Sequence, residues 1–356
     1  MTISALDKTK VLLGLSGGVD STAAALLLQN KGFKVTGLYF DVHQEKGPGA
    51  DLAEKSATQL GIDYVYRNVY QDFSDTVIAN FCSEYLEGKT PNPCVLCNPT
   101  IKFKTLLEEA DKIGAYYIGT GHYARVHFNE NNRCFYVRQA ENTKKDQSYM
   151  LYRLGQEVLS RLLLPLDGIS DKEETRNLVR AVSMTNAEQK DSQEICFLAN
   201  EENYIDYIDN KGFHSKQGDF IDENGNVLGK HQGLIHYTIG QRKGLGITFG
   251  KPVYVTRVNS NDNTVTLGSD EDLFKNKVIS MDNTFVVPEG ETWQMYDGLK
   301  ISAKIRYASS PAEATLKILE DGLIETEFMA LQRAVTPGQS IVFYQEDLVI
   351  GGGIIK

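Results

Sequence analysis

Short apolar runs alternate with longer amphipathic stretches over the first third of the chain. Strand-like runs stand at residues 10–15, 34–40, 63–69 and 115–120, and stretches of helical spacing stand at 22–30, 50–60, 73–86 and 102–113. A glycine stands where each of these helices would end, at Gly32, Gly61, Gly88 and Gly114. Alternation of this kind predicts an α/β domain with a doubly wound parallel sheet covered by helices on both faces.

The pattern changes along the rest of the chain. Residues 133–176 predict a hairpin followed by helices, and residues 202–267 are rich in turn signals, among them Asn224 and Gly225, which predict a tight β-hairpin. Later apolar runs at 299–307, 314–319, 323–328 and 340–343 predict a small β-barrel-like domain. The sequence therefore predicts three domains, at residues 1–200, 201–272 and 273–356.

Composition limits the class of protein. Of 356 residues, 41% are hydrophobic and 24% are charged, as in soluble globular proteins. We find no signal-peptide core, and the longest aliphatic stretch, residues 23–28, is too short to cross a bilayer. We therefore expect a cytoplasmic protein without a membrane partner. The net charge of −10 argues against indiscriminate nucleic-acid binding and leaves a specific RNA partner open.

A polar loop at residues 16–21, Ser-Gly-Gly-Val-Asp-Ser, joins the first predicted strand to the first predicted helix. Free N–H groups at a helix N-terminus attract an anion, and Gly17 and Gly18 let the backbone approach a phosphate closely. Asp20 is a candidate Mg²⁺ ligand. No lysine follows the glycines, so this is not a Walker A motif. We interpret the loop as a pyrophosphate-binding site of an enzyme that cleaves ATP between the α and β phosphates; an ordinary glycine-rich turn is the alternative.

Five cysteines, an odd number spread widely, do not form the pattern of a secreted disulfide framework. Cys94 and Cys97 lie just before the helix predicted to begin near Lys102. A thiol beside a helix N-terminus and a basic residue has a depressed pKa, which makes Cys97 a candidate nucleophile. A buried structural thiol or half of a zinc site is the alternative, but no second C-x-x-C or His pair is present. Cys82 and Cys134 are expected to be structural.

The loop at residues 16–21 resembles the PP-loop of the N-type ATP pyrophosphatases. A further thiol, Cys196, closes the segment Asp-Ser-Gln-Glu-Ile-Cys. Together with the proline-flanked cysteine pair, this arrangement resembles the tRNA-specific 2-thiouridylase family. Further matching segments, in family order, are residues 119–125, 145–148, 236–244, 306–307 and 336–339. The resemblance implies a PP-loop domain of the adenine nucleotide alpha hydrolase type, a small central tRNA-contacting domain and a C-terminal β-barrel.

The resemblance also implies a reaction. ATP, with Mg²⁺, adenylates O2 of the wobble uridine in tRNAs for Lys, Glu and Gln, and sulfur then replaces that oxygen with release of AMP. Cys196 would carry the sulfur as a persulfide delivered by a cysteine desulfurase or a relay protein. Cys97 would attack the activated base or release the sulfur by forming a disulfide with Cys196. A monomer is expected, since the substrate spans several domains.

Family motifs assign three groups of site residues by resemblance. The ATP site is expected to comprise Gly14, Leu15, Ser16, Gly17, Gly18, Val19, Asp20, Ser21, Phe40 and Gly121. The target base is expected to meet Asn92, Pro93 and Cys94. The tRNA is expected to contact His122, Lys145, Asp146, Gln147, Arg306, Tyr307 and Gln339. A core histidine is an equal alternative for His122, and an ordinary strand is the alternative for Arg306 and Tyr307.

One residue departs from the family pattern. Many members carry aspartate where this chain has Cys94, and a thiol titrates well above a carboxylate, so the acid/base role of that aspartate does not transfer. Cys94, Cys97 and Cys196 together raise the hypothesis of an iron–sulfur cluster with one open iron, as an alternative to the persulfide–disulfide route. The loop at residues 41–49 is also short for the family.

Two other classes of function fit part of these observations. A PP-loop ligase acting on a small molecule would keep the ATP site and would need neither Cys97 nor Cys196. A non-catalytic nucleotide-sensing or RNA-binding protein would leave the thiols idle. The cysteines therefore discriminate among the three classes.

Overall fold

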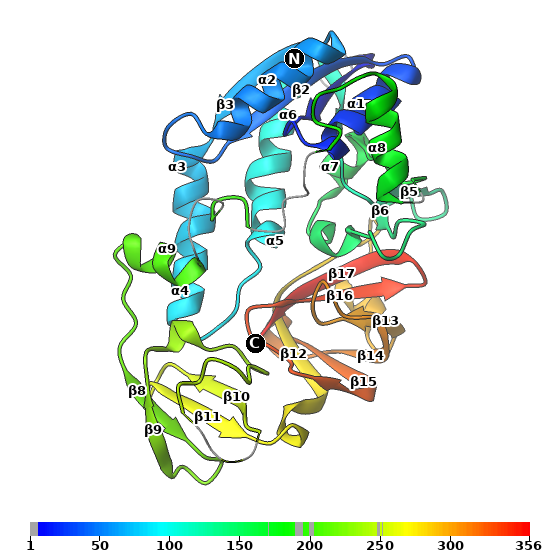
Figure 1. Cartoon of the computed structure of the whole chain (residues 1–356). Helices are drawn as coiled ribbons and strands as arrows, with labels where there is room; N and C mark the ends of the chain where they lie inside the picture. The colour runs from blue at the N-terminus through cyan, green and yellow to red at the C-terminus, as the bar shows by residue number, and fades with distance from the viewer. Residues whose placement is uncertain (1–5, 170, 189–194, 199–202, 248–249, 251) are drawn as a thin grey trace.

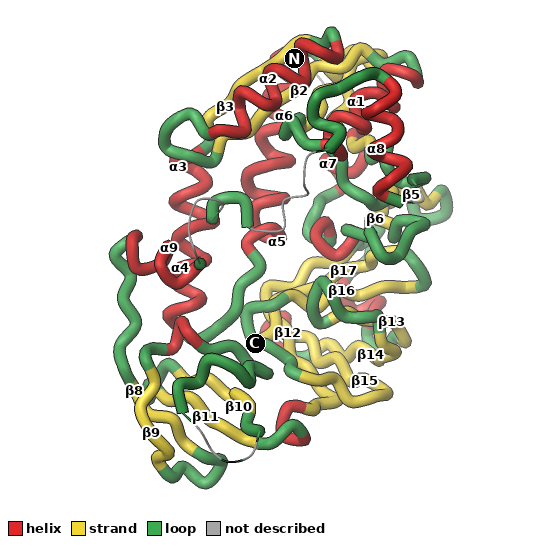
Figure 2. The backbone as a smooth tube through the Cα atoms, viewed as in Figure 1, coloured by secondary structure: helices red, strands yellow, loops and turns green. Residues whose placement is uncertain are grey.

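The computed structural model describes residues 6–169, 171–188, 195–198, 203–247, 250 and 252–356 (Figure 1). Helices gather around the first sheet, and strands make up most of the C-terminal part (Figure 2). This division into a helix-rich first part and a strand-rich C-terminal part follows the change in hydrophobic pattern along the sequence. Among these residues, no helix combines the length and the apolar character needed to cross a membrane.

The first sheet is parallel throughout, with the strand order β3-β2-β1-β4-β7. Four of its strands fall where the apolar runs predicted them, which confirms the doubly wound α/β fold. Since β1 is central, the loop that follows it lies where the strand order reverses, the usual ligand position in such sheets. The strands are β1 (Asp7–Gly14), β2 (Lys34–Asp41), β3 (Asp63–Asn68), β4 (Ala115–Gly119) and β7 (Leu162–Leu163).

Helices cover both faces of this sheet. Val11 and Leu13 of β1 are fully buried against α1 (Val19–Asn30) and α8 (Lys172–Ala181). Leu12, between them, packs on the opposite side against α6 (Phe103–Lys112). A strand covered on both faces has to be apolar at successive positions, which explains the Val-Leu-Leu run. α2 (Pro48–Leu60) packs along β2 and β3.

The segment that carries Cys94 and Cys97 forms a longer helix than the sequence predicted. α5 (Pro93–Cys97), a π-helical turn η3 (Asn98–Lys102) and α6 follow one another directly, so the helical segment begins at Pro93 and not near Lys102. The Asn92 side chain caps it by accepting a hydrogen bond from the Cys94 N–H at 3.2 Å. Proline is favoured at the first helical position, and the π turn accommodates a second proline that has no N–H to donate.

A second long helical segment confirms the helix predicted at residues 73–86. It consists of α3 (Tyr70–Phe73), the π-helical turn η2 (Ser74–Ile78) and α4 (Ala79–Leu86). Its buried face includes Phe73, Val77 and Phe81. These side chains form a hydrophobic cluster with Phe197, so a segment far along the sequence is anchored on this helix.

The middle part of the chain forms a four-stranded sheet in the order β10-β11-β8-β9. β8 and β9 are antiparallel, and the turn between them contains Asn224 and Gly225, which confirms the predicted hairpin. Gly225 has φ +83°, a left-handed conformation that favours glycine. The elements of this part are α9 (Tyr204–Asn210), β8 (Gly218–Ile221), β9 (Val227–His231), η5 (Leu234–His236), β10 (Tyr254–Asn259) and β11 (Thr264–Gly268).

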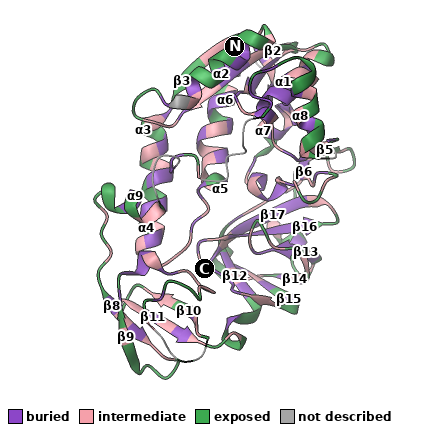
Figure 3. Cartoon of the chain, in the orientation of Figure 1, coloured by how far each residue is buried: buried purple, intermediate pink, exposed green. Residues whose placement is uncertain are grey.

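Six antiparallel strands close into a C-terminal barrel, which confirms the barrel-like domain. The closing pair is β12 with β17, and the interior includes Leu316, Ile341 and Phe343. Most residues of β16 and β17 are buried (Figure 3). The elements are η6 (Glu271–Leu273), β12 (Phe274–Phe285), η7 (Trp293–Tyr296), β13 (Lys300–Lys304), β14 (Ala312–Ile318), η8 (Glu320–Gly322), β15 (Ile324–Arg333), β16 (Ser340–Gln345) and β17 (Leu348–Ile355).

Two details of the barrel differ from the pattern along the sequence. The strand predicted at 299–307 ends at Lys304, because the Ser309 N–H and hydroxyl both bond to the Arg306 carbonyl and close a turn. The hairpin β5 (Arg125–Asn129) and β6 (Cys134–Arg138) also extends the barrel sheet, since β6 pairs with β17. The remaining elements are η4 (Ser148–Leu151) and α7 (Gln156–Arg161). The domain boundaries at 200 and 272 stay predictions.

Candidate active site

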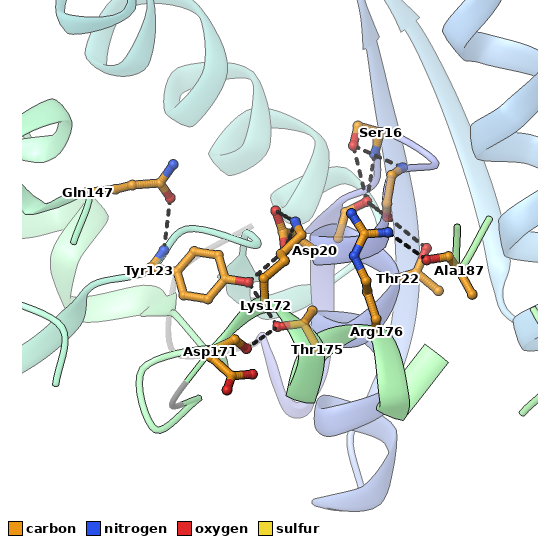
Figure 4. Close-up of polar contacts among 12 residues, drawn as sticks. Ser16, Asp20, Thr22, Tyr123, Gln147, Asp171, Lys172, Thr175, Arg176 and Ala187 are labelled. Carbon is orange, nitrogen blue, oxygen red and sulfur yellow. Dashed lines mark hydrogen bonds and ion pairs between the residues drawn. The ribbon is translucent and has the colours of Figure 1, made fainter. Parts of the chain in front are cut away.

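The loop at residues 16–21 runs from β1 into the first turn of α1, and Figure 4 shows the polar contacts around it. The Ser16 N–H donates to Ser21 Oγ at 3.2 Å, and the Gly18 N–H donates to Ser16 Oγ at 3.3 Å. Ser21 Oγ donates to the Gly18 carbonyl at 3.1 Å. Gly18 occupies the N-cap and has no side chain to cap the helix, so the first-turn N–H groups remain available to an anion.

The backbone of α2 packs directly against Gly17. This residue has φ +77°, and a Cβ added there would lie 2.7 Å from the backbone carbon of Leu52. Its carbonyl accepts a hydrogen bond at 2.6 Å from Asn186 Nδ2, which also donates to Thr22 Oγ1 at 2.8 Å. Asn186 is buried, and within the described part of the chain its Oδ1 has no hydrogen-bond partner. Sequence reasoning missed this residue because it lies outside every motif.

Asp20, the predicted Mg²⁺ ligand, is paired with a lysine from a distant helix. Lys172 Nζ, on α8, lies 2.7 Å from Asp20 Oδ1 and 2.8 Å from Oδ2 (Figure 4). The Tyr123 hydroxyl donates to Asp20 Oδ1 at 2.7 Å and contacts Thr175 Oγ1 at 2.9 Å. A carboxylate beside an anion-binding loop is the ligand type that Mg²⁺ prefers. Asp20 therefore fits its predicted role, which stays a prediction.

The other residues predicted for the ATP site gather around the same loop. A Cβ on Gly121, just after β4, would lie 2.9 Å from the Asp20 carbonyl carbon. A Cβ on Gly14 would lie 3.2 Å from the ring of Phe40, at the end of β2. The carboxyl ends of three neighbouring strands therefore meet here, and side chains larger than hydrogen at Gly14 and Gly121 would crowd the site.

Phe40 connects the loop to the cysteines. It packs against the core cluster that contains Phe103 of α6, and also against the cluster that contains Phe197. Cys97 packs against this second cluster. The structure therefore brings the nucleotide loop and the cysteine helix to one end of the first sheet, although about 80 residues separate them along the chain.

The pKa of Cys97 is shifted in the direction opposite to the predicted one. Burial raises its pKa, the neighbouring Cys94 adds to the rise, and Lys102 opposes it. The prediction of a depressed pKa was wrong because burial outweighs the effect of Lys102. Cys97 is also the last residue of α5 and does not precede the helical segment. Cys94 occupies the first turn instead and is exposed, whereas Cys97 is half-buried.

Cys196 lies near the other two thiols. It is accessible to solvent, yet crowding by protein atoms, followed by the effects of Cys97 and Cys94, raises its pKa to about 12. Its neighbour Phe197 is buried in the cluster against which Cys97 packs. The structure therefore brings the predicted catalytic pair into one region. Residues 191–194 of the predicted motif lie outside the described residues.

The three cysteines do not fit an iron–sulfur cluster. Across the described ranges, no group of three or more His, Cys, Asp or Glu side chains is arranged to hold a metal ion. Cys94 is exposed and Cys97 is half-buried one turn further along the same helix. The described residues therefore give no support to the iron–sulfur hypothesis.

The surroundings of His122 favour its neutral form. Burial, followed by the charge of Lys102, lowers its pKa to about 3. Its Nδ1 lies 2.7 Å from Thr120 Oγ1, and its ring stacks on Phe103 with 6.1 Å between centroids. These contacts match the alternative of a packed histidine after a strand. A tRNA contact by His122 stays a prediction, and it would depend on hydrogen bonding and not on charge.

The segment at residues 145–147 has a buried member. Asp146 is only 4% exposed and accepts hydrogen bonds from the N–H groups of Ala140 and Ser148. Its predicted contact with tRNA therefore does not agree with this structure, in which the carboxylate shapes the loop. Lys145 is partly exposed, and the Gln147 side chain accepts a hydrogen bond from the Tyr123 N–H at 3.0 Å. Their tRNA contacts stay predictions.

Tyr307 lies in an aromatic and cationic group at the barrel. Lys304 Nζ lies 5.7 Å from the Tyr307 ring centroid and 5.8 Å from that of Tyr149. Burial lowers the pKa of Lys304. Arg306 donates to the Arg333 carbonyl at 3.3 Å. Sequence reasoning missed Lys304, although it stands two residues before the predicted pair.

Gln339 joins the barrel to the approach of the cysteine helix. Its Nε2 donates to the Thr90 carbonyl at 2.7 Å, and the Thr90 N–H donates to the Pro337 carbonyl at 2.9 Å. Thr90 Oγ1 also contacts Thr238 Oγ1 of the middle part at 3.2 Å. The segment before α5 is thus held by both later parts of the chain. The predicted tRNA contact of Gln339 stays a prediction beside this observed structural role.

Comparison with known families matches the chain in three consecutive parts. Residues 9–200 match the model described as the tRNA methyl transferase HUP domain. Residues 206–269 match the tRNA methyl transferase PRC-barrel domain, and residues 282–355 match the aminomethyltransferase beta-barrel domain. These parts correspond to the parallel sheet, the four-stranded sheet and the closed barrel described above.

Curated relatives match over nearly the whole chain. The tRNA-specific 2-thiouridylase MnmA of Clostridium kluyveri is 44% identical, over 97% of this chain and 99% of its own length. The enzyme of the same name from Clostridioides difficile is 42% identical over 98% of both chains. That from Acetivibrio thermocellus is 40% identical over 99% of this chain and its whole length. With the PP-loop and the neighbouring cysteines in place, the chain belongs to the tRNA-specific 2-thiouridylase family.

Proposed function

We propose that the protein is a tRNA-uridine 2-sulfurtransferase that makes 2-thiouridine at the wobble position of tRNA. The observation that carries this proposal is the junction at Phe40, which packs against the Gly14 end of the nucleotide loop and against the cluster of Cys97. A small-molecule ligase would have no use for thiols at that place. The family relationship favours the same function.

The first half-reaction activates the uridine carbonyl. The residues at 16–21 and the first turn of α1 would hold the phosphates of ATP through backbone N–H groups, and Asp20 would hold Mg²⁺, which neutralises phosphate charge. The uridine O2 attacks the α-phosphorus and pyrophosphate leaves. Oxygen at C2 thereby becomes part of AMP, a good leaving group.

The second half-reaction delivers sulfur. Cys196, being accessible, would accept sulfur from a donor as a persulfide, through a cysteine desulfurase or a relay protein. Cys97 then attacks the inner sulfur, forming a Cys97–Cys196 disulfide and releasing hydrosulfide, which displaces AMP at C2. Alternatively, the persulfide attacks C2 and Cys97 cleaves the resulting disulfide linkage. Either route leaves a disulfide that an external thiol has to reduce.

The same proposal extends to the partners. The tRNAs for Lys, Glu and Gln are the proposed substrates. A monomer is proposed because the three parts of one chain together would span the substrate, and action in the cytoplasm is proposed because the related enzymes modify tRNA. The persulfide route is preferred to a cluster route because the three cysteines do not converge on a metal position.

The direct test is incubation with tRNA, ATP, Mg²⁺ and a persulfide donor, followed by mercury-affinity gel retardation of thiolated tRNA. We expect a shifted band for the unmodified protein and none for Cys97→Ser or Cys196→Ser. Cys134→Ser is the matched control, since its thiol is buried in the barrel cluster, and it should retain turnover. Cys82→Ser should also retain turnover, because that thiol is fully buried, although it belongs to the cluster against which Cys97 packs. Product formed by Cys97→Ser and Cys196→Ser at the control rate would refute the proposal.

A second measurement isolates the ATP half-reaction. Asp20→Ala should abolish AMP release and leave tRNA binding largely intact, because the residue is assigned to the metal and not to the RNA. Gel-shift titration measures tRNA binding, and thin-layer chromatography of labelled nucleotide measures AMP. Normal AMP release by Asp20→Ala would contradict the assignment.

A further inference from the structure

The nucleotide loop contains no lysine, and the structure supplies one from elsewhere. Lys172 stands at the first position of α8, following the N-cap Asp171, whose side chain accepts from the Glu174 N–H. Its ammonium contacts both carboxylate oxygens of Asp20, at 2.7 and 2.8 Å. The lysine side chain is 16% exposed and that of Asp20 is 35% exposed, so the pair borders solvent at the loop.

The backbone that carries Lys172 is anchored by packing. α8 packs on α1, with Val179 fully buried in the cluster that includes Ala23 and Leu28. Thr175, one turn after Lys172, is also fully buried and contacts the Tyr123 hydroxyl. The flexible four-carbon stem of the lysine can therefore relocate its charge while the helix stays fixed.

Mg²⁺ bound to Asp20 would compete with the Lys172 ammonium, which contacts both carboxylate oxygens. Mg²⁺ binds carboxylate oxygen at about 2.0–2.1 Å, and two cations on the same pair of oxygens repel each other strongly. Binding of the metal with ATP would therefore weaken the Lys172–Asp20 ion pair and favour movement of the ammonium. The phosphate chain that the loop would hold offers the ammonium a multiply charged partner, in addition to the carboxylates of Asp171, Glu173 and Glu174 at the start of α8.

The two faces of the sheet indicate which phosphates receive the ammonium. Phe40 and the cysteines lie on the side of α5 and α6, so the uridine has to approach the α-phosphorus from there. Lys172 belongs to α8, which covers the opposite face (Figure 1). Displacement at phosphorus proceeds roughly in line, with the leaving group opposite the attacking oxygen. The pyrophosphate end of ATP is therefore directed toward Lys172.

We propose that Lys172 binds the pyrophosphate portion of ATP, and that Asp20 holds its ammonium until Mg²⁺ and ATP arrive. This inference rests on the proposed adenylation, and it adds a residue to it. In the folded protein, Lys172 would take the place of the lysine that follows the glycines in a Walker A motif and that the loop at residues 16–21 lacks. It would also stabilise the charge on departing pyrophosphate, which makes it a candidate catalytic residue.

The test compares three ligands by equilibrium titration without tRNA. For Lys172→Met we expect affinity for ATP and for pyrophosphate to fall roughly 10- to 100-fold, as for a lost hydrogen bond between charged groups, with affinity for AMP unchanged. Lys172→Arg should recover most of the ATP affinity because it keeps the charge. Lys55→Met, an exposed lysine on α2, is the matched control and should bind all three ligands normally.

Two outcomes would overturn the inference. Unchanged ATP affinity in Lys172→Met means that the lysine only pairs with Asp20. Equal losses for ATP, pyrophosphate and AMP mean that it only supports the loop. If the unpaired Asp20 charge prevents folding of Lys172→Met, the double variant Asp20→Asn, Lys172→Met removes both charges, and Asp20→Asn alone is its reference for the Lys172 effect. None of these titrations involves tRNA, so the thiolation assay tests the proposed function separately.

Discussion

Individual thiols determine how the proposed sulfur chemistry depends on pH. A thiol surrounded by protein and by other thiols loses its proton reluctantly, since the thiolate is poorly solvated and repelled. This is the state of Cys196 and Cys97. Cys196 is nevertheless accessible, so a donor can reach it. In the free chain, the thiolate form of Cys196 is therefore disfavoured at neutral pH.

The first prediction concerns alkylation of Cys196. In the free enzyme we expect iodoacetamide to modify it more slowly at neutral pH than a free cysteine, with the rate rising as pH increases toward about 12. Because the folded-state pKa lies above the unfolded value of about 8.5, the neutral thiol favours the folded state below that value, and this stability is lost as pH rises through the folded pKa. Mass spectrometry of the Cys196 peptide measures the rate. Modification at neutral pH as fast as that of free cysteine would contradict the prediction.

The second prediction concerns His122. Its folded-state pKa of about 3 lies below the unfolded value, so its contribution to stability is present above about pH 6.5 and is lost as pH falls toward 3. His122→Gln should therefore show a shallower loss of unfolding free energy on acidification than the unmodified protein. His214→Gln, at an exposed histidine, is the control and should keep the original slope. Denaturant titrations across this pH range measure the slopes; equal slopes for His122→Gln and the unmodified protein would sink the prediction.

At the scale of elements, two helix starts define the site. α1 begins at a glycine without a capping side chain and leaves its N–H groups to a ligand. α5 begins at Pro93 under the Asn92 cap and presents Cys94 in its first turn. The different caps suit different tasks, because an anion site needs free donors and a thiol site needs a fixed helix.

The third prediction tests the junction between the loop and α2. Gly17→Ala should destabilise the protein by about 1–3 kcal/mol, because the residue has a left-handed φ and faces the α2 backbone, and ATP binding should weaken with it. Gly18→Ala is the matched control for stability, since its φ is −79° and an added Cβ would lie 3.4 Å from the flexible Ser16 Oγ. Urea titration measures the free energy of unfolding of both variants. A Gly17→Ala variant as stable as Gly18→Ala would show that the contact is not restrictive.

At the scale of the whole molecule, the three parts meet at the approach to the cysteine helix. Gln339 and Pro337 of the barrel and Thr238 of the middle part all bond to Thr90. A Cβ on Gly338 would lie 3.0 Å from the Thr90 backbone nitrogen, so the turn and this segment are in close contact. An RNA bound across the later parts of the chain could therefore influence the position of α5.

The fourth prediction follows from this contact. Gln339→Ala removes the bond to Thr90 and should increase hydrogen exchange at residues 88–92 and reduce thiolation, with ATP affinity unchanged because the nucleotide loop is not involved. Gln332→Ala, at a glutamine whose Nε2 bonds locally to Ala330, is the control and should leave exchange there unaltered. Exchange at residues 88–92 unaltered in Gln339→Ala would mean that the bond does not hold the segment.

Much of this architecture was predictable from local pattern. The Val-Leu-Leu run of β1 predicted a strand buried on both faces, and Asn224 with Gly225 predicted a hairpin, because period and turn chemistry act over a few residues. The start of the helix at Pro93 was missed because proline is compatible with both a stiff loop and a helical first position. The pKa of Cys97 was predicted in the wrong direction because burial, which depends on tertiary packing, outweighs the effect of Lys102.

The sequence by itself determined the order of strands and helices, the nucleotide loop and the presence of three thiols, because each depends on neighbouring residues or on a motif. Tertiary structure alone decided that Lys172 meets Asp20, that Asn186 meets Gly17 and that Phe40 joins the loop to the thiols. Those contacts connect residues tens to more than a hundred positions apart, and no short-range pattern records which distant side chains the packed sheet will bring together.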